Sequence, residues 1–191
     1  MKKDIIISGV GGQGIVSIAA IIGYAAVEEG LSFKQSEVHG MSQRGGDVSS
    51  HFRLSSEKIY SDLIPYGSAD LIISVEPMEA LRYLPYLAED GWLITNTKPY
   101  ENITNYPEIG EILSEIKKVP NNIAIDADQI AKSIGSPKSA NVVILGCASA
   151  FLDIDYKKLE NAIKLIFRNK GEEIVSANLT ALSEGRKIAI G

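Results

Sequence analysis

Cysteine is almost absent from this sequence, which has a single one, Cys147, among 191 residues. One cysteine cannot form an internal disulfide, and it cannot supply the four thiolates that usually hold an iron–sulfur cluster. Cys147 lies in the apolar run NVVILGCASAFLD, which is typical of a buried helix, so we expect it in the core and not in catalysis. If the protein takes part in electron transfer, another chain must carry the electrons.

Long apolar runs and concentrated basic charge are also lacking. No run reaches membrane-spanning length, and the apolar stretch after MKKD stops at once in a glycine-rich loop, unlike a signal peptide. The formal net charge is −5, and lysine and arginine occur singly or in short pairs, whereas nucleic-acid binding needs a basic face. We therefore expect a cytoplasmic protein that binds neither membranes nor nucleic acid.

Metal-binding and nucleophile motifs are missing as well. The two histidines, His39 and His51, lie far apart in the sequence without clustered cysteines, so no metal site is expected. The sequence contains no nucleophile-elbow, P-loop or calcium-loop pattern. His51 falls in a strand pattern, which favours a structural role. His39, beside Gly40, is equally compatible with a functional role and with holding its loop.

Short apolar strands alternate with helix patterns up to NIAIDA at residues 122–127, and the remainder of the chain is predicted to be helical. This alternation predicts a single α/β domain over residues 1–191, with a Rossmann-like, doubly wound, mostly parallel sheet and helices on both faces. Alternating polarity in residues 47–55 suggests a strand more exposed than the first. Pro85 should kink or end the helix predicted over 76–90. The predicted strands are 4–8, 31–38, 47–55, 69–75, 91–97 and 122–127, and the other predicted helices are 15–29, 109–118, 126–135, 140–153, 156–171 and 171–185.

A glycine-rich loop, GVGGQG, joins the first predicted strand to the first predicted helix. Gly9, Gly11 and Gly14 form the G-x-G-x-x-G pattern, in which glycines permit a tight turn, close backbone approach to a pyrophosphate and tight helix packing. Free N–H groups at the helix N-terminus would face an anion. The acidic residue that usually binds a ribose follows about 20 residues later, and Glu37 comes a few positions beyond that. A nucleotide-type ligand (NAD, FAD or the ADP part of coenzyme A) and a compact turn without a ligand fit this loop equally well.

A second polar loop, EVHGMSQRGG, follows the second predicted strand over residues 37–46. With GVGGQG before it and SSHFRL after it, it resembles the gamma family of 2-oxoacid:ferredoxin oxidoreductases. The likeness continues through SADLIISVEPMEALRYLPYL, GWLITNT, IDADQIAKSIGSPKSANVVILG and SANLTALSEG, and so covers nearly the whole chain. Within this family, a free-standing chain of this length is most similar to the beta subunit of the enzymes that oxidise indolepyruvate.

The resemblance implies a subunit of an oxidoreductase that is inactive alone. The family decarboxylates a 2-oxoacid with coenzyme A as co-substrate, which gives an acyl-CoA, carbon dioxide and reduced ferredoxin. It uses thiamine diphosphate with magnesium, and iron–sulfur clusters. This sequence has neither the cysteines for clusters nor a GDG followed by a distant asparagine for the magnesium of thiamine diphosphate. The resemblance therefore implies a large alpha partner subunit that carries these groups, with ferredoxin reached through the complex.

The resemblance also implies where the chain meets its partner. Because the carboxyl ends of parallel strands share one edge of a sheet, the two loops should lie together and form a lip facing the thiamine site and the coenzyme A channel. None of the residues in these two loops is assigned as an acid, a base or a nucleophile. Asn141 and Asn178 also match the family pattern, and we expect each to cap a helix. The site residues implied by the resemblance are Gly9, Gly11, Gly12, Gln13, Gly14, Glu37, His39, Gly40, Ser42, Gln43, Arg44 and Gly45.

Two other interpretations remain open from the residues alone. The glycine loop and Glu37 are also compatible with a stand-alone protein that binds a dinucleotide or a flavin. Alternatively, the chain is a scaffold whose glycine loop is empty and which only buries a face of its partner.

Overall fold

The computed structural model describes residues 1–40, 45–101 and 103–191. Strands and helices are interspersed up to residue 125, and helices make up the rest of the chain, as the sequence predicts. The strands are β1 (Lys2–Val10), β2 (Ser32–His39), β3 (Asp47–Ser55), β4 (Ala69–Ser74), β5 (Leu87–Asn96) and β6 (Asn122–Ile125). The α-helices are α1 (Ile15–Glu28), α2 (Pro77–Tyr83), α3 (Ile109–Ile116), α4 (Ala127–Ser133), α5 (Ala140–Ala148), α6 (Tyr156–Phe167) and α7 (Glu172–Ile190).

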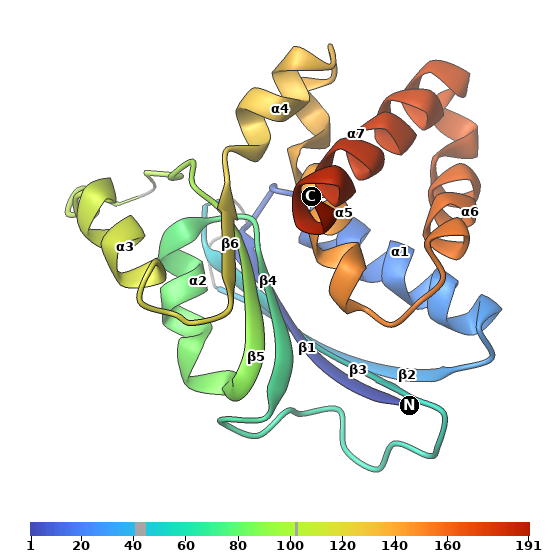
Figure 1. Cartoon of the computed structure of the whole chain (residues 1–191), viewed down its shortest axis with the longest axis horizontal. Helices are drawn as coiled ribbons and strands as arrows, with labels where there is room; N and C mark the ends of the chain where they lie inside the picture. Colours follow the sequence, from blue (N-terminus) through green and yellow to red (C-terminus); the bar gives the residue numbers. More distant parts are fainter. Residues whose placement is uncertain (41–44, 102) are drawn as a thin grey trace.

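Within the described residues, the strands form one six-stranded sheet in the order β2-β3-β1-β4-β5-β6. The pairs β1–β4, β4–β5 and β5–β6 are parallel, whereas β3 runs antiparallel to both β1 and β2. Helices cover both faces of the sheet, which gives three layers (Figure 1). The predicted fold class, an α/β fold with a mostly parallel sheet, is confirmed.

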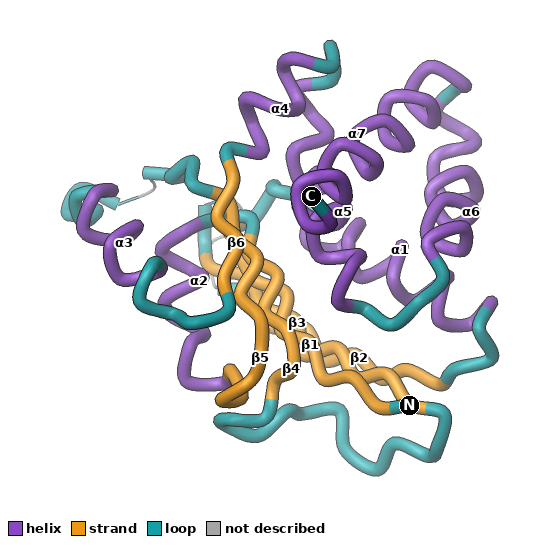
Figure 2. Tube along the Cα trace, in the orientation of Figure 1, coloured by secondary structure: helices purple, strands orange, loops and turns teal. Residues whose placement is uncertain are grey.

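Each face of the sheet has its own hydrophobic core. Ile5 and Ile7 of β1 pack with residues of α1, α4, α5, α6 and α7, while Ile6 packs with residues of α2 and α3. Figure 2 shows these two groups of helices on opposite sides of the sheet. Successive side chains of a strand face opposite sides, so a strand covered on both faces needs an unbroken apolar run. This requirement explains the sequence DIIIS at the start of the chain.

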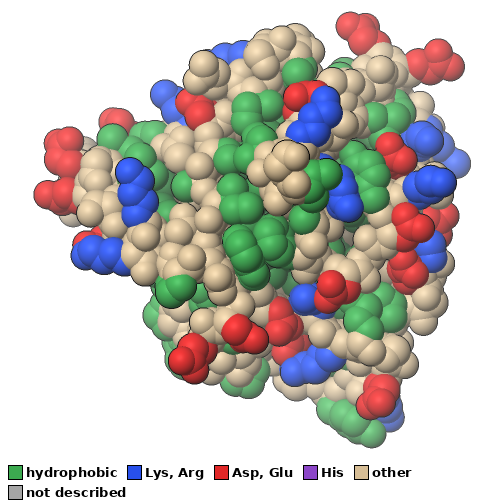
Figure 3. Space-filling view, in the orientation of Figure 1, with side chains coloured by type: hydrophobic (Ala, Val, Ile, Leu, Met, Phe, Trp, Pro, Cys, Tyr) green, Lys and Arg blue, Asp and Glu red, His purple; other side chains and the backbone are tan. Residues whose placement is uncertain are grey.

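The surface carries charges of both signs. On the face shown in Figure 3, acidic and basic side chains are interspersed around the rim, and hydrophobic side chains gather nearer the middle. Among the described residues, none of the helices combines the length and the apolar character that crossing a bilayer requires.

The prediction that the strand over residues 47–55 is relatively exposed was wrong. β3 is buried along most of its length, because it lies between β1 and β2 and is covered by helices. The exposed strand is instead β2, at the edge of the sheet. The prediction took the polar residues of this strand to be exposed. Ser49 and Ser50 of β3 are polar but buried, so polarity did not indicate exposure here.

The helix predicted over residues 76–90 is much shorter than expected. α2 ends at Tyr83, and Pro85 lies in the short 3-10 helix Leu84–Tyr86 that follows. The prediction that Pro85 ends the helix is thus confirmed. Residues 87–90, which the pattern assigned to the helix, begin β5 instead, because proline cannot continue the helical hydrogen-bond ladder.

Helices α5 and α7 cross at very close range. A Cβ atom at Gly146 would overlap the backbone oxygen of Leu182, and a Cβ atom at Gly185 would overlap the backbone oxygen of Val143. The two backbones therefore touch at a pair of glycines. This contact fixes α5 against the sheet, and the start of α5 borders the candidate site described below.

Replacing Gly185 with alanine should destabilise the protein. The added methyl group has no space between the two backbones, so we expect the free energy of unfolding to fall by about 2 kcal/mol, despite the better helix propensity of alanine. Gly110→Ala in α3 is the matched control, because nothing lies within 4 Å of its Cβ position, and it should leave stability unchanged or raise it by up to about 1 kcal/mol. Urea unfolding measures both, and equal stabilities of the two variants would contradict this account.

Candidate functional site

The glycine loop lies at the carboxyl end of β1, between this strand and α1. Gly12 and Gly14 have φ angles of 100° and 83°, a left-handed region that residues with a side chain rarely adopt. A Cβ atom at Gly9 would overlap the side chain of Val75, so this position needs glycine for space. The loop sequence is therefore dictated by backbone geometry at two positions and by close packing at a third.

Gln13 holds the glycine loop in shape. Its Oε1 accepts a hydrogen bond from the Val10 N–H at 2.8 Å, and its own N–H donates to the Val10 oxygen at 3.1 Å. The side chain of Gln13 thus folds back onto β1. The loop is pre-formed, and no ligand is needed to order it.

The glycine loop and the loop between β2 and β3 are joined directly. The Gly11 N–H donates a hydrogen bond to the Gly46 oxygen at 2.8 Å. The predicted proximity of the two loops is confirmed. Gly45 has a φ angle of 81°, which again favours glycine. Ser42, Gln43 and Arg44, which the resemblance places in the same site, lie outside the described residues.

Glu37, His39 and Gly40 lie at the start of this second loop. Glu37 accepts a hydrogen bond from the Gln35 amide at 3.0 Å, and its other carboxylate oxygen contacts Nε2 of His39. The Gly40 N–H donates to the Asp47 oxygen at 2.8 Å, which closes the hairpin. The Glu37–His39 pair is exposed, so both side chains are accessible from outside the chain.

Glu37 does not lie where a dinucleotide-binding fold places its ribose-binding acid. In that fold the acidic residue ends the strand next to β1. Here β3 separates β2 from β1, and neighbouring strands are about 4.8 Å apart, which puts β2 roughly 10 Å away. The geometry therefore argues against Glu37 as the ribose partner of the glycine loop.

Two adjoining cavities border the glycine loop, and both include Gly12, Gln13, Lys138 and Asn141. One has a volume of about 340 Å³ and the other about 370 Å³. The first is completed by Val75, Asn96, Asp128, Pro137, Ala140 and Ile144. The second is completed by Gly14, Ser17, Ser136, Ser139, Phe167, Lys170, Ile174 and Asn178.

The second of these cavities is suited to an anionic ligand, since no acidic side chain lines it, whereas Asp128 lines the first. Helix α1 starts at Ile15 without a side-chain cap and without an acidic residue in its first turn, so its N-terminal N–H groups remain available. Lys138 and Lys170 add positive charge to the walls, and serine and asparagine side chains add donors and acceptors. A helix N-terminus between two lysines provides the donors and charge that a phosphate or pyrophosphate requires.

Asn141 and Asn178 do not cap helices, so that expectation was wrong. Asn141 is the second residue of α5, and its Nδ2 donates to the Gly14 oxygen at 3.2 Å. Asn178 lies inside α7, where its Nδ2 donates to the Ile174 oxygen at 2.8 Å and its Oδ1 accepts from the Ser139 hydroxyl at 3.2 Å. The N-cap residues of α5 and α7 are Ser139 and Gly171, and neither helix has a side-chain cap; both asparagines line the cavity next to the glycine loop.

Comparison with known proteins identifies the family of this chain. Residues 4–188 match the family described as pyruvate ferredoxin/flavodoxin oxidoreductase. The chain belongs to this family. The resemblance noted from the sequence motifs is thereby confirmed.

Within the family, the chain is similar over its whole length to a small subunit. It is 38% identical to the indolepyruvate oxidoreductase subunit IorB of Archaeoglobus fulgidus, over 100% of this chain and 96% of the relative. The gamma subunit of a keto/oxoacid ferredoxin oxidoreductase from Geobacter sulfurreducens is 25% identical, with a TM-score of 0.69 and 98% of each chain covered.

A longer member of the family contains the same fold. The 2-oxoglutarate:ferredoxin oxidoreductase from Magnetococcus marinus, solved with 2-oxoglutarate, coenzyme A and succinyl-CoA bound, gives a TM-score of 0.78 at 24% identity. The match covers 99% of this chain but 31% of that one. In that protein, this fold is one part of a larger polypeptide.

Sequence reasoning missed two buried carboxylates beside the site, Glu76 and Glu79. Glu76 lies just after the end of β4. Its carboxylate accepts hydrogen bonds from the Glu79 N–H at 2.8 Å, the Tyr100 N–H at 3.2 Å and the Tyr106 hydroxyl at 2.5 Å. It thereby caps α2 and ties the segment after β5 to β4. The signal was present in the sequence, since an acidic residue between a buried strand and a proline is typical of a helix N-cap.

Helix α2 contacts the base of the second loop through Tyr83, while Glu79 is paired within the helix. The buried carboxylate of Glu79 pairs with Nε of Arg82 at 2.8 Å, and burial raises the pKa of Glu79 although Arg82 opposes the shift. The Tyr83 hydroxyl on the same helix lies 3.5 Å from the Asp47 carboxylate at the base of the second loop. Helix α2 thus contacts the first residue of β3, next to the second loop.

His51 and Cys147 have the structural roles that the sequence predicts. Nδ1 of His51 accepts a hydrogen bond from the Ile64 N–H at 3.0 Å, and burial lowers the pKa of His51. Cys147 is fully buried, and burial raises the pKa of its thiol to about 12. Neither residue faces the cavities, so neither is a candidate for chemistry.

His51 should make stability depend on pH. Because burial lowers its pKa below the ordinary 6.5, the unfolded chain binds the proton more readily than the folded one. The contribution is therefore complete above about pH 6.5 and is lost as the pH falls toward the lower pKa of the folded state.

The variant His51→Asn, which keeps a hydrogen-bond acceptor but does not titrate, isolates this contribution. The difference in unfolding free energy between the wild type and this variant should shrink on going from about pH 7.5 to about pH 5.5. Urea unfolding at each pH measures it. Parallel pH curves for the two proteins would show that His51 titrates alike in both states.

Proposed function

We propose that this chain is the small, cofactor-free subunit of a 2-oxoacid:ferredoxin oxidoreductase that acts on an aryl pyruvate such as indolepyruvate. Full-length similarity to an indolepyruvate oxidoreductase subunit supports the family branch. The match to the gamma subunit from Geobacter sulfurreducens covers 98% of each chain, which supports a similar subunit role. The reaction would give an acyl-CoA, carbon dioxide and reduced ferredoxin.

The residues of this chain do not fit the redox and carbanion cofactors of such an enzyme. Its one cysteine is buried, with a pKa of about 12. In the part of the chain that the structure describes, no group of three or more histidine, cysteine, aspartate or glutamate side chains is placed to hold a metal ion. We therefore assign thiamine diphosphate, its magnesium ion and the iron–sulfur clusters to a large alpha subunit, which would also pass electrons to ferredoxin.

The role that fits this chain is to bind and orient coenzyme A at the edge of the partner's site. The observation that carries this assignment is the second cavity, which lies between the N-terminus of α1, Lys138 and Lys170. Coenzyme A carries a pyrophosphate and a ribose phosphate, which match these donors and charges. The loop over residues 37–46, joined to the glycine loop at Gly46, would form the lip toward the partner.

A stand-alone dinucleotide- or flavin-binding protein is the competing function. The glycine loop favours it, but β3 separates Glu37 from β1, which removes the usual ribose partner. A scaffold with an empty glycine loop is the third possibility. The experiments below give a different result for each.

Co-expression with candidate large subunits tests the proposed function. We expect a stoichiometric, iron-containing complex that reduces ferredoxin with indolepyruvate and coenzyme A, and no activity when this chain is omitted. Pull-down, iron analysis and assays with indolepyruvate, pyruvate and 2-oxoglutarate measure this directly. Capture of no partner, together with tight binding of NAD or a flavin by the isolated chain, would establish the stand-alone function instead.

Lys138→Ala tests the coenzyme A site in the assembled complex. Loss of one charged contact to a phosphate should raise KM for coenzyme A roughly tenfold while kcat changes little. Lys117→Ala is the matched control, since this exposed lysine ends α3 on the opposite face of the sheet, and its KM should stay at the wild-type value. Equal KM values for both variants would favour the scaffold with an empty glycine loop.

A further inference from the structure

Helix α1 has a second apolar face that the chain itself does not cover. No charged residue occurs from Ile15 to Val27. One side of the helix is buried on the sheet and against α6, but Val16, Tyr24 and Val27 on the other side are 56%, 51% and 61% exposed. A helix that is hydrophobic all round normally lies in an interior, so this side of α1 has the composition of a buried surface.

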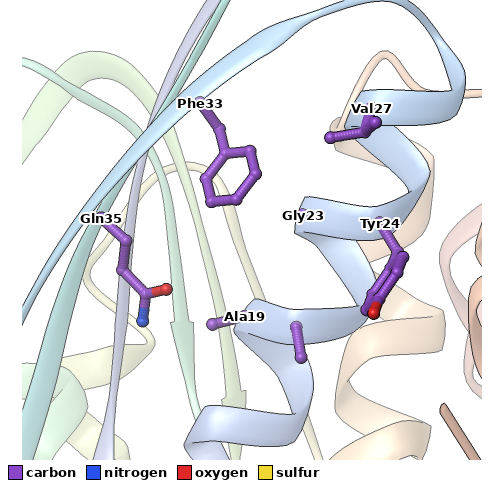
Figure 4. Close-up of a pocket in the computed structure, with 7 residues that line it drawn as sticks. Ala19, Gly23, Tyr24, Val27, Phe33 and Gln35 are labelled. Carbon is purple, nitrogen blue, oxygen red and sulfur yellow. The ribbon is translucent and has the colours of Figure 1, made fainter.

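The exposed side of α1 and the edge strand β2 enclose a groove of about 220 Å³. Phe33 and Gln35 extend from β2 toward the helix, as Figure 4 shows, and Gly23 faces the ring of Phe33. A Cβ atom at Gly23 would come within 3.3 Å of that ring. Phe33 also stacks on Phe52 of β3 with 5.2 Å between ring centroids, so the floor of the groove is fixed.

Beside this groove, β2 presents an open edge. β2 pairs with β3 on one side, and on its other side it has no neighbouring strand among the described residues. Its residues are mostly exposed, and it has neither a proline nor a bulge that would discourage pairing. An open strand edge next to an apolar groove is the surface used in β-strand addition.

The apolar surface is continuous with the candidate site. Val16 follows Gly14 by two residues, at the first turn of α1. Val38, 57% exposed near the end of β2, is not part of this surface, because side chains alternate along a strand and it faces the side of the sheet opposite to Phe33 and Gln35. The surface begins beside the glycine loop and runs along α1 and β2 away from it.

We propose that an extended segment of the large oxidoreductase subunit pairs with β2 as an additional strand and inserts apolar side chains into the groove against Tyr24, Val27 and Phe33. The identity of this partner rests on the proposed function. Continuity with the edge of the sheet that faces the partner's site supports it. In the Magnetococcus marinus enzyme the same fold occurs within a longer polypeptide.

A second copy of this chain fits the edge poorly. Symmetric antiparallel pairing of β2 with itself has four central registers. Centring on Lys34 or on Glu37 places two like charges opposite each other, centring on Gln35 places Phe33 opposite Glu37, and centring on Ser36 places Lys34 opposite Val38. Each register sets a charge against a like charge or against an apolar side chain, so the strand edge favours a different partner.

Charge substitution on the exposed face of α1 tests the proposal in the complex. Val27→Glu and Tyr24→Glu should each weaken binding of this chain to the purified large subunit by about 30-fold or more, because a carboxylate would be buried against apolar side chains. Ile190→Glu at the end of α7 is the matched control, since Ile190 is 62% exposed and Val27 is 61% exposed. Its affinity should stay within about twofold of the wild type. Circular dichroism checks that all three variants fold.

Hydrogen exchange of the wild-type complex gives a second readout that needs no variant. Amides in residues 32–39 should exchange more slowly in the complex than in the isolated chain. Wild-type affinity of both α1 variants, or unchanged exchange in β2 on complex formation, would overturn the docking surface while leaving the subunit function intact. A wild-type chain that is a dimer alone and becomes a monomer on Val27→Glu would assign the surface to a second copy and overturn the proposal. Failure of the chain to bind any large subunit would overturn the proposed function with it.

Discussion

Nine residues of β1 pair antiparallel with nine of β3, from Lys2 opposite Ser55 to Val10 opposite Asp47. This register brings the start of β3 level with the glycine loop, so that Gly46 can accept the hydrogen bond from Gly11. A slip by one residue would turn every side chain of β3 to the wrong face. The buried pair of Asp4 and Arg53, with 2.7 Å between Oδ1 and Nε, fixes the opposite end of the same two strands. The shape of the candidate site therefore depends on a pairing between segments about 45 residues apart in sequence.

The elements of the fold could be predicted from the sequence, whereas the neighbours of each strand could not. The spacing of apolar residues indicates the type of each element, and glycine and proline mark where elements end. For this reason β1, α1 and the strand over 47–55 were predicted close to their true bounds. No local sequence pattern indicates that β3 lies between β1 and β2. Its burial was therefore predicted wrongly. The same limit applies to the site. Both loops at the strand ends were predicted to meet, because the edge of a parallel sheet is a general rule. Lys138, Lys170 and Asn178 were missed or misassigned. The two lysines lie in short 3-10 segments that precede α5 and α7, and Asn178 lies in α7, so their positions depend on how these helices pack.

The site combines a hydrogen-bonded backbone with charged side chains, and none of its described residues is assigned as acid, base or nucleophile. Some backbone N–H groups of the glycine loop are bonded within the chain, through Gln13 and through the bond from Gly11 to Gly46. The N-terminus of α1 has no side-chain cap and can therefore face a ligand. A pre-formed cradle of this kind loses little conformational entropy when an anion binds. In the proposed complex, the partner supplies the reacting groups and this chain positions the ligand. The apolar face of α1 begins at the same edge of the sheet, where such a partner would contact this chain.

Cys147 lies at the crossing of α5 and α7, next to Gly146, and it is completely enclosed. Only the thiolate reacts readily with alkylating reagents and oxidants, and a pKa of about 12 keeps this group protonated at neutral pH. In the folded chain, its only thiol therefore does not react readily with such reagents. Modification of Cys147 requires the two helices to separate, so its alkylation rate measures how often this layer of the protein opens.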